Sequence, residues 1–196
     1  MTASRWAEFY DAVAERPPHD TVVEALDQFD REGRRGFAVD LGCGDGRETV
    51  ELVRRGWRVL AIDAEPEAIA RLRARPGLAD VETAVARFED ATWPDVDLVN
   101  AGFSLPFCPP EHFGAVWARI AASIRPGGRF SGQLFGDRDE WAGEREMTFM
   151  TRAEAESLLA GFELERFDEV EADGQTALGE PKHWHVFHVV ARRPDR

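Results

Sequence analysis

Residues 37–49 read Phe-Ala-Val-Asp-Leu-Gly-Cys-Gly-Asp-Gly-Arg-Glu-Thr, a short apolar run followed by glycines at positions 42, 44 and 46. The run is typical of a buried strand, and the residues after the glycines are compatible with a helix. Glycine has no Cβ and accepts φ values that other residues avoid, so such a turn lets the backbone approach a ligand closely. The stretch therefore predicts a strand, a ligand-binding turn and a helix.

A carboxylate after a second apolar run supports this interpretation. Residues 59–62 are apolar and Asp63 follows them, much as Asp40 stands near the end of the first run. In Rossmann-like units an acidic side chain at this place accepts hydrogen bonds from ribose hydroxyls. The glycine turn alone could be an ordinary loop, and the two carboxylates favour a nucleotide site. A nicotinamide dinucleotide turn would need glycine at position 47, where the chain has Arg47.

The pattern Asp-x-Gly-x-Gly-x-Gly at a strand end resembles motif I of the class I S-adenosylmethionine (SAM)-dependent methyltransferases. The Arg-Pro-Gly-Gly link at 125–128 is also similar to the segment that leads into this family's fifth strand. The motifs cover residues 37–135, and the remainder resembles the family by architecture only. Within the family, Gly-Cys-Gly-Asp-Gly-Arg-Glu-Thr followed by Gly-Trp-Arg-Val is most similar to the compact tellurite-resistance and thiopurine-methyltransferase-like enzymes.

The order of apolar patterns and turn signals predicts alternating strands and helices. The resemblance implies an α/β fold: a Rossmann-like three-layer sandwich with a seven-stranded, mostly parallel sheet and an antiparallel last strand. We expect strands at 37–41, 57–63, 81–85, 97–103, 129–135, 162–170 and 184–191. A polar connection is expected between the last two strands. Residues 1–196 are predicted to form one domain.

The first 36 residues are predicted to form an N-terminal helical segment. Trp6, Phe9, Tyr10 and Val13 recur at helical spacing, and a second apolar stripe follows a pair of prolines. In the class I methyltransferases, helices ahead of the glycine turn often fold over the cofactor and the substrate. The alternative is that this segment only docks on the sheet.

The resemblance implies that SAM is the cofactor and that it lies at the carboxyl ends of the first four strands. Arg87 stands where the family usually has an acidic residue, so the adenine contacts at 88–90 are uncertain by one position. A polar turn at a strand end is the alternative there. The expected cofactor contacts are Asp40, Gly42, Cys43, Gly44, Asp63, Ala64, Phe88, Glu89, Asp90, Asn100 and Phe103.

The acceptor side is expected to combine the N-terminal segment with residues 136–147, the longest stretch without an apolar pattern. Tyr10, Arg16 and Trp141 are the expected substrate contacts. No catalytic base is assigned, because nothing singles out one of His112, Glu146, His183 and His185. A metal site is not expected, since His183 and His185 share one face of a strand while His188 faces the other way.

Composition bounds the remaining possibilities. The formal net charge of −13 argues against a nucleic-acid partner. No apolar run approaches the ~20 residues of a membrane span, and the first residues lack a signal core, so we expect a cytoplasmic protein. The two cysteines, Cys43 and Cys108, are too few for a disulfide framework or a cysteine zinc site. A monomer and a homodimer are both compatible with the sequence.

The function that follows from the resemblance is SAM-dependent methyl transfer to a small-molecule acceptor, in detoxification or natural-product biosynthesis. The turn after the fourth predicted strand is not Asn-Pro-Pro-aromatic, the signature of enzymes that methylate amines of bases or amide nitrogens. The alternative is a non-catalytic SAM-binding sensor or regulatory protein, which would share every motif named above.

Overall fold

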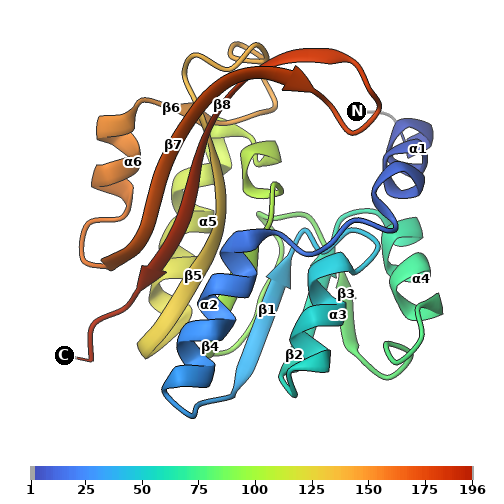
Figure 1. Ribbon diagram of the computed structural model, residues 1–196, viewed down its shortest axis with the longest axis vertical. Helices are drawn as coiled ribbons and strands as arrows, with labels where there is room; N and C mark the ends of the chain where they lie inside the picture. The colour runs from blue at the N-terminus through green and yellow to red at the C-terminus, as the bar shows by residue number, and fades with distance from the viewer. Residues whose placement is uncertain (1–2, 196) are drawn as a thin grey trace.

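The computed structural model describes residues 3–195, and its centre is a mixed β-sheet (Figure 1). The strands are β1 (Phe37–Leu41), β2 (Arg58–Asp63), β3 (Glu82–Val85), β4 (Val96–Ala101), β5 (Ile124–Gly136), β6 (Phe149–Met150), β7 (Glu163–Gln175) and β8 (Pro181–Arg192). Their order is β3-β2-β1-β4-β5-β8-β7, and β6 pairs with β5 beside this path. Within the described sheet, β8 is the strand that runs antiparallel to its neighbours β5 and β7. The Rossmann-like architecture with an antiparallel β8 is confirmed.

Helices cover both faces of the sheet. They are α1 (Ala3–Val13), α2 (Asp20–Arg31), α3 (Arg47–Arg54), α4 (Pro66–Ala74), α5 (Pro110–Ser123) and α6 (Arg152–Leu158), with a short 3-10 helix η1 (Leu105–Phe107). The buried side chains of α2, α3 and α4 pack on one face, and those of α5 and α6 pack on the other (Figure 1). No helix among residues 3–195 is long and apolar enough to cross a bilayer.

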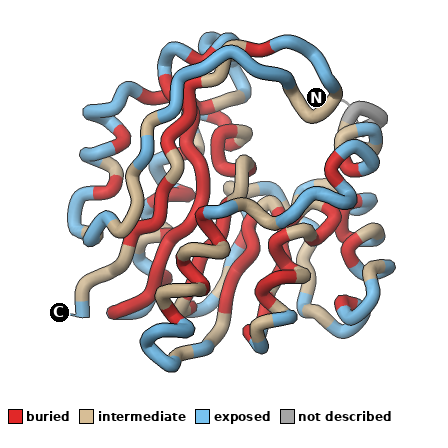
Figure 2. The backbone as a smooth tube through the Cα atoms, in the orientation of Figure 1, coloured by how far each residue is buried: buried red, intermediate tan, exposed pale blue. Residues whose placement is uncertain are grey.

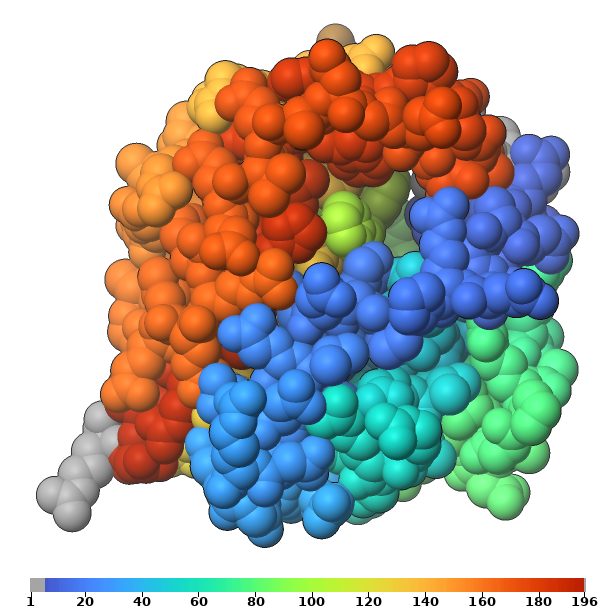
Figure 3. Space-filling view, in the orientation of Figure 1, coloured from blue at the N-terminus to red at the C-terminus, as the bar shows by residue number. Residues whose placement is uncertain are grey.

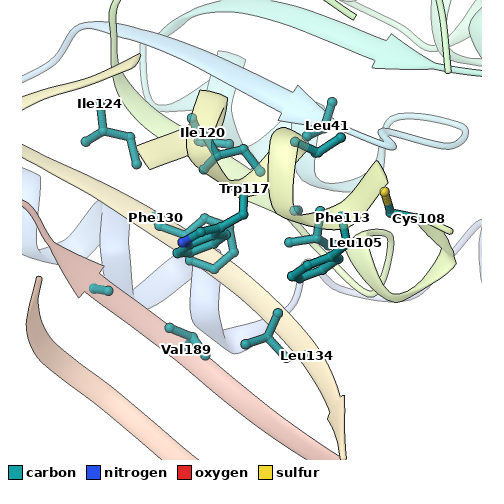
Figure 4. Close-up of a cluster of buried hydrophobic side chains, with 14 of the residues drawn as sticks. Leu41, Leu105, Cys108, Phe113, Trp117, Ile120, Ile124, Phe130, Leu134 and Val189 are labelled. Atoms are coloured by element: carbon teal, nitrogen blue, oxygen red, sulfur yellow. The ribbon is translucent and has the colours of Figure 1, made fainter. Parts of the chain in front are cut away.

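The largest cluster of buried side chains lies under α5. Phe113, Trp117 and Ile120 follow the helical spacing expected of them and meet apolar residues of β5 and β8 (Figure 4). The Trp117 and Phe130 rings meet edge to face with their centroids 5.0 Å apart. This packing fixes the strands whose carboxyl ends carry the site.

The connection between the last two strands is shorter than predicted, because both strands extend into it. β7 and β8 continue through residues 171–183 as a paired hairpin, with Ala172 opposite Trp184 and Gln175 opposite Pro181. The distal part of β7 is exposed, so it lacks the alternation of buried and exposed residues that marks a strand (Figure 2). The hairpin curves over the carboxyl ends of the other strands toward α1 (Figure 1). We call residues 171–183 the arch.

Two smaller differences concern β5 and the segment after it. β5 begins at Ile124, so the Arg-Pro-Gly-Gly link expected to be a turn lies inside the strand, with a register shift against β4. Gly127 and Gly128 exchange backbone hydrogen bonds with Arg193, which extends the pairing at this end. Phe149 and Met150 add an eighth strand, too short to give a sequence pattern.

Candidate functional site

The glycine turn after β1 is held against the end of β2 by the backbone. The N–H groups of Gly42 and Cys43 both donate to the carbonyl of Ile62, at 2.7 and 3.0 Å. Gly42 has φ of +73°, and a Cβ at this position would lie 2.3 Å from Cβ of Ser104. Glycine is therefore required, and the turn leaves its backbone open to a cavity.

Asp63, at the end of β2, binds both this turn and the next one. Its Oδ2 accepts from the Gly44 N–H and its Oδ1 from the Glu65 N–H, each at 2.9 Å. Burial raises the pKa of the Asp63 carboxyl, while these backbone donors oppose the rise. The carboxylate thus positions the turn and also lines the cavity.

Asp40 lies behind the turn and does not line the cavity. It is 1% exposed and accepts from the Thr49 hydroxyl at 2.5 Å and from the Asn100 amide at 2.9 Å. Asn100 in turn accepts from the Ser131 hydroxyl at 2.9 Å. This buried network ties β1, β4, β5 and α3 together beneath the cavity.

Asp40 makes stability depend on pH. Burial, and then the negative charge of Glu48, raise its pKa from the ordinary 3.8 to about 7. Between these values the folded protein keeps the proton and the unfolded chain releases it, so the free energy of unfolding falls as pH rises. We expect Asp40→Asn to be more stable than the parent by about 1–2 kcal/mol at about pH 8.5, because weaker hydrogen bonds to Thr49 and Asn100 offset part of the gain.

Urea unfolding of both proteins across this pH range measures the effect. The advantage of Asp40→Asn should be smallest at the acid end, grow up to about pH 7 and then level off. If the parent were more stable than Asp40→Asn above pH 7, the raised pKa of Asp40 would be contradicted.

A cavity of about 1140 Å³ opens at the carboxyl ends of the strands. It lies beneath the arch and beside the N-terminal segment, where the space-filling view shows a deep hollow (Figure 3). The predicted contacts that line it are Tyr10, Arg16, Gly42, Cys43, Gly44, Asp63, Ala64, Phe88, Glu89, Phe103 and Trp141. Asp40, Asp90 and Asn100 do not line it. The structure thus brings most of the predicted residues into one space.

Glu89 carries an unsatisfied buried oxygen at one end of this cavity. Its Oε1 accepts from Arg87 Nε at 2.7 Å, whereas its Oε2 is buried and has no hydrogen-bond partner among the described residues. A buried carboxylate oxygen without a donor is unfavourable unless a ligand supplies one. The pairing also explains the unusual Arg87, which lines the same cavity and neutralises Glu89.

Aromatic rings form the opposite half of the cavity. Trp6 of α1 meets Phe107 with ring centroids 5.4 Å apart, and Trp141 meets Trp184 of β8 at 5.7 Å. Phe135 of β5 lies 5.9 Å from Trp184. Trp141 and Trp6 lie in the two segments expected to form the acceptor wall. Phe107, Phe135 and Trp184 were not predicted, because apolar residues within helix and strand patterns are usually core.

Tyr10 and Arg16 occupy different parts of the wall. Tyr10 is buried over the glycine turn, where a Cβ on Gly44 would lie 3.3 Å from its ring. Burial, with the charges of Asp63 and Glu65, raises the pKa of the Tyr10 phenol, so it stays protonated. Arg16 is exposed at the cavity rim. Tyr10 therefore covers the glycine-turn half, and its ring also stacks on Trp6 of the aromatic half with centroids 6.1 Å apart.

A polar cluster that the sequence did not reveal joins the two halves. His19 Nδ1 lies 2.9 Å from Glu48 Oε1, and Arg47 Nε donates to the same oxygen at 2.8 Å. Burial raises the pKa of Glu48, but the hydrogen bond from His19 and the charge of Arg47 outweigh it and lower that pKa overall. The contact depends on α3 lying against the loop before α2, which the sequence does not indicate.

The other candidate bases are differently placed. Glu146 lines the cavity, whereas His112 does not. His183 pairs with Asp173 at 2.7 Å on the surface, and His185 is fully buried, 2.9 Å from Glu169. Among residues 3–195 no group of three or more His, Cys, Asp or Glu side chains is arranged to hold a metal ion.

Comparisons with known proteins relate this site to others. Residues 38–128 match the family model described as "Methyltransferase domain". The trans-aconitate 2-methyltransferase of Methylobacterium nodulans is 35% identical over 105 residues, which is 52% of this chain and 39% of that protein. The carboxy-S-adenosyl-L-methionine synthase of Citrifermentans bemidjiense is 35% identical over 98 residues, 45% of this chain and 40% of that protein. The chain thus spans less than half the length of these curated relatives.

Two solved structures share the fold. TehB from Haemophilus influenzae has a TM-score of 0.79 at 19% identity, over 94% of this chain and 65% of that one. The Burkholderia thailandensis 1,6-didemethyltoxoflavin-N1-methyltransferase has a TM-score of 0.69 at 25% identity, over 98% of this chain and 85% of that one. The latter was solved with 1,6-didemethyltoxoflavin and S-adenosylhomocysteine bound.

Proposed function

Because this chain belongs to the class I SAM-dependent methyltransferases, we propose that it transfers the methyl group of SAM to a small-molecule acceptor. One observation carries the proposal: the glycine-turn half and the aromatic half form a single cavity. SAM supplies a methyl group already activated by its positive sulfur. The protein contributes by holding the acceptor in line with that methyl group and by excluding water.

The residues of the glycine-turn half fit SAM. Asp63 keeps free lone pairs for ribose hydroxyls, and the unsatisfied Glu89 Oε2 suits the adenine amine. The turn at Gly42 admits close approach of the methionine part, because no side chain stands there. Asp40 contributes indirectly, because its hydrogen bonds fix the strands that carry these contacts.

The aromatic half supports an acceptor with an apolar, flat body. Trp6, Phe107, Trp141 and Trp184 supply ring faces and edges, and pockets of this kind bind small organic molecules. The Burkholderia thailandensis enzyme, which is similar over nearly the whole chain, bears a name that specifies methylation at a nitrogen, N1. Methylation of a natural product, or of a compound to be detoxified, is the role we propose.

SAM and S-adenosylhomocysteine are expected to bind with one molecule per chain, and NADH is not expected to bind. The Gly42-x-Gly44-x-Gly46 spacing and the Arg47 side chain suit the first pair and not a dinucleotide. Isothermal titration calorimetry with each ligand decides this. Binding heat with NADH and none with SAM would contradict the proposal. Release of S-adenosylhomocysteine with any acceptor then separates an enzyme from a SAM-binding sensor.

Tyr10→Ala and Trp141→Ala should have different effects. Tyr10 covers the glycine turn, so its loss should weaken SAM binding by about tenfold, through lost packing. Trp141 lies in the aromatic half, so its loss should lower methyl transfer and leave SAM affinity within about twofold. Calorimetry with SAM and a transfer assay with an identified acceptor provide the readouts. Trp141→Phe serves as the matched control. A SAM defect in Trp141→Ala would place that residue in the cofactor half.

A further inference from the structure

Phe103 forms the floor of the aromatic half and is held in an unusual conformation. Its φ of +49° is the only positive value of a non-glycine residue in the described chain. Its ring centroid lies 4.8 Å from His19, 6.1 Å from His188 and 6.2 Å from Trp184. Strained residues of this kind persist where the surroundings over-determine them, often at binding sites. Two imidazoles therefore border the ring on which an acceptor would lie.

The buried Gln133 fixes the orientation of a polar chain beneath Phe103. The Phe103 N–H donates to Gln133 Oε1 at 2.9 Å, so the other end of this amide must be its NH₂ group. That NH₂ group lies 3.0 Å from the Thr21 hydroxyl and 3.4 Å from His188 Nδ1. An amide NH₂ only donates, so His188 Nδ1 must accept. A neutral His188 then carries its proton on Nε2.

His188 is neutral near physiological pH. Burial lowers the pKa of its imidazole, and the charge of Arg166 adds to this. Asp168 acts in the opposite direction but is paired with Arg166 at 2.7 Å. The Nε2–H group has no hydrogen-bond partner in the part of the chain that the structure describes, and His188 lines the cavity. His188 therefore offers the cavity a free N–H donor beside the Phe103 ring.

We propose that His188 is a specificity-determining residue, whose Nε2–H group donates to a carbonyl oxygen or ring nitrogen of a flat aromatic acceptor. The inference rests on the proposed function and names the substrate class of the same site. A heteroaromatic carbonyl compound or azine meets both requirements, a planar body for the rings and a lone pair for His188. A purely hydrocarbon ring meets only the first.

Two other polar groups near the rings, His19 and Lys182, are already paired. Both ring nitrogens of His19 lie within hydrogen-bond distance of Arg47, and Nδ1 also faces Glu48. The Lys182 ammonium lies among the rings of Trp141 and Trp184, but it is paired with Asp139 and does not line the cavity. Of these three groups, His188 is therefore the one that keeps an N–H group free for the acceptor's lone pair.

The first arm of the test measures the tautomer of His188. Nitrogen-15 NMR of the histidine-labelled protein near neutral pH should show a signal of the Nε2–H tautomer that His188→Phe removes. Gln133→Glu should convert this signal to the Nδ1–H tautomer, because a carboxylate beside Nδ1 only accepts. An Nδ1–H tautomer in the parent protein would overturn the proposal.

The second arm measures recognition in the protein saturated with S-adenosylhomocysteine. The probes are carbostyril, a flat bicyclic lactam, and naphthalene, which has the same size without the lone pair. We expect carbostyril to bind about five- to tenfold more tightly to the parent, and His188→Phe to abolish this preference. His188→Gln, which keeps an N–H donor, should restore part of it. His112→Phe, outside the cavity, should behave like the parent.

The outcomes separate this inference from the proposed function. Failure of S-adenosylhomocysteine to bind would contradict the proposed function itself. If the protein binds S-adenosylhomocysteine but binds the two probes equally well, or binds neither, only the role of His188 is overturned. The same holds if His188→Phe keeps the preference for carbostyril.

Discussion

Asp63→Ala is expected to weaken SAM binding about 100-fold, or roughly 3 kcal/mol. We propose that this carboxylate accepts from the ribose hydroxyls, and it also holds the turn through the N–H groups of Gly44 and Glu65. Its removal leaves the hydroxyls without an acceptor in a partly buried site. It also frees the N–H groups of Gly44 and Glu65, so the turn loses its side-chain link to β2 and keeps only the backbone bonds of Gly42 and Cys43 to Ile62.

Calorimetry with SAM measures this loss, and two variants separate its causes. Asp63→Asn keeps one oxygen for a turn N–H but loses the charge and one acceptor, so it should fall between the parent and Asp63→Ala. Glu67→Ala removes a carboxylate of α4 that pairs with Arg71 outside the cavity, and it should bind SAM like the parent. Circular dichroism should show an intact fold in all three. An affinity of Asp63→Ala within about twofold of the parent would mean that Asp63 does not bind the ribose.

The parts of the fold that the sequence predicts are those with local signals. Residues 37–41 are apolar except for Asp40, end at glycines and form β1 with the expected bounds. Pro66 opens α4, and Thr151 with Glu154 forms a capping box at the start of α6, both signals that are legible in the sequence. Each of these depends on neighbours along the chain, so one sequence suffices. The glycine turn belongs to the same group.

The arch and the aromatic half depend on contacts between distant segments. Trp6, Phe107, Trp141 and Trp184 come from four separate elements, and their meeting depends on the register of β7 against β8. A strand that leaves the sheet has no buried face, so its sequence has the composition of a polar loop. The sequence therefore predicted two of these rings, Trp6 and Trp141, in the wall segments and gave Phe107 and Trp184 no role.

Asp40 shows a limit of a different kind. Its position in the motif predicted a cofactor contact, and the structure places it in a buried network with Thr49 and Asn100. A motif specifies that a carboxylate is needed, but it does not specify whether the carboxylate faces the ligand or the strands behind it. Burial distinguishes the two roles, and it depends on packing that a single sequence does not reveal.

The buried pair of Lys182 and Asp139 is expected to be the most sensitive point of the aromatic half. Both side chains are almost fully buried, and the ammonium lies 3.8 Å from the Trp184 ring centroid and 4.2 Å from that of Trp141. Asp139 also accepts from the backbone N–H groups of Trp141 and His185, at 3.0 and 3.1 Å. The pair thus fastens the loop after β5 to β8.

Lys182→Met should lower the free energy of unfolding by about 3–5 kcal/mol, because it leaves the Asp139 charge buried without its counter-ion. Combining Lys182→Met with Asp139→Asn should recover most of this loss, because no lone charge remains. The control is Arg54→Met, which removes an exposed cation of α3 and should cost less than about 1 kcal/mol. Urea unfolding followed by circular dichroism gives the three values. The single variant should keep its SAM affinity, because Asp63 and Glu89 lie in the other half of the cavity. A double variant no more stable than Lys182→Met would show that the pair contributes packing rather than charge compensation.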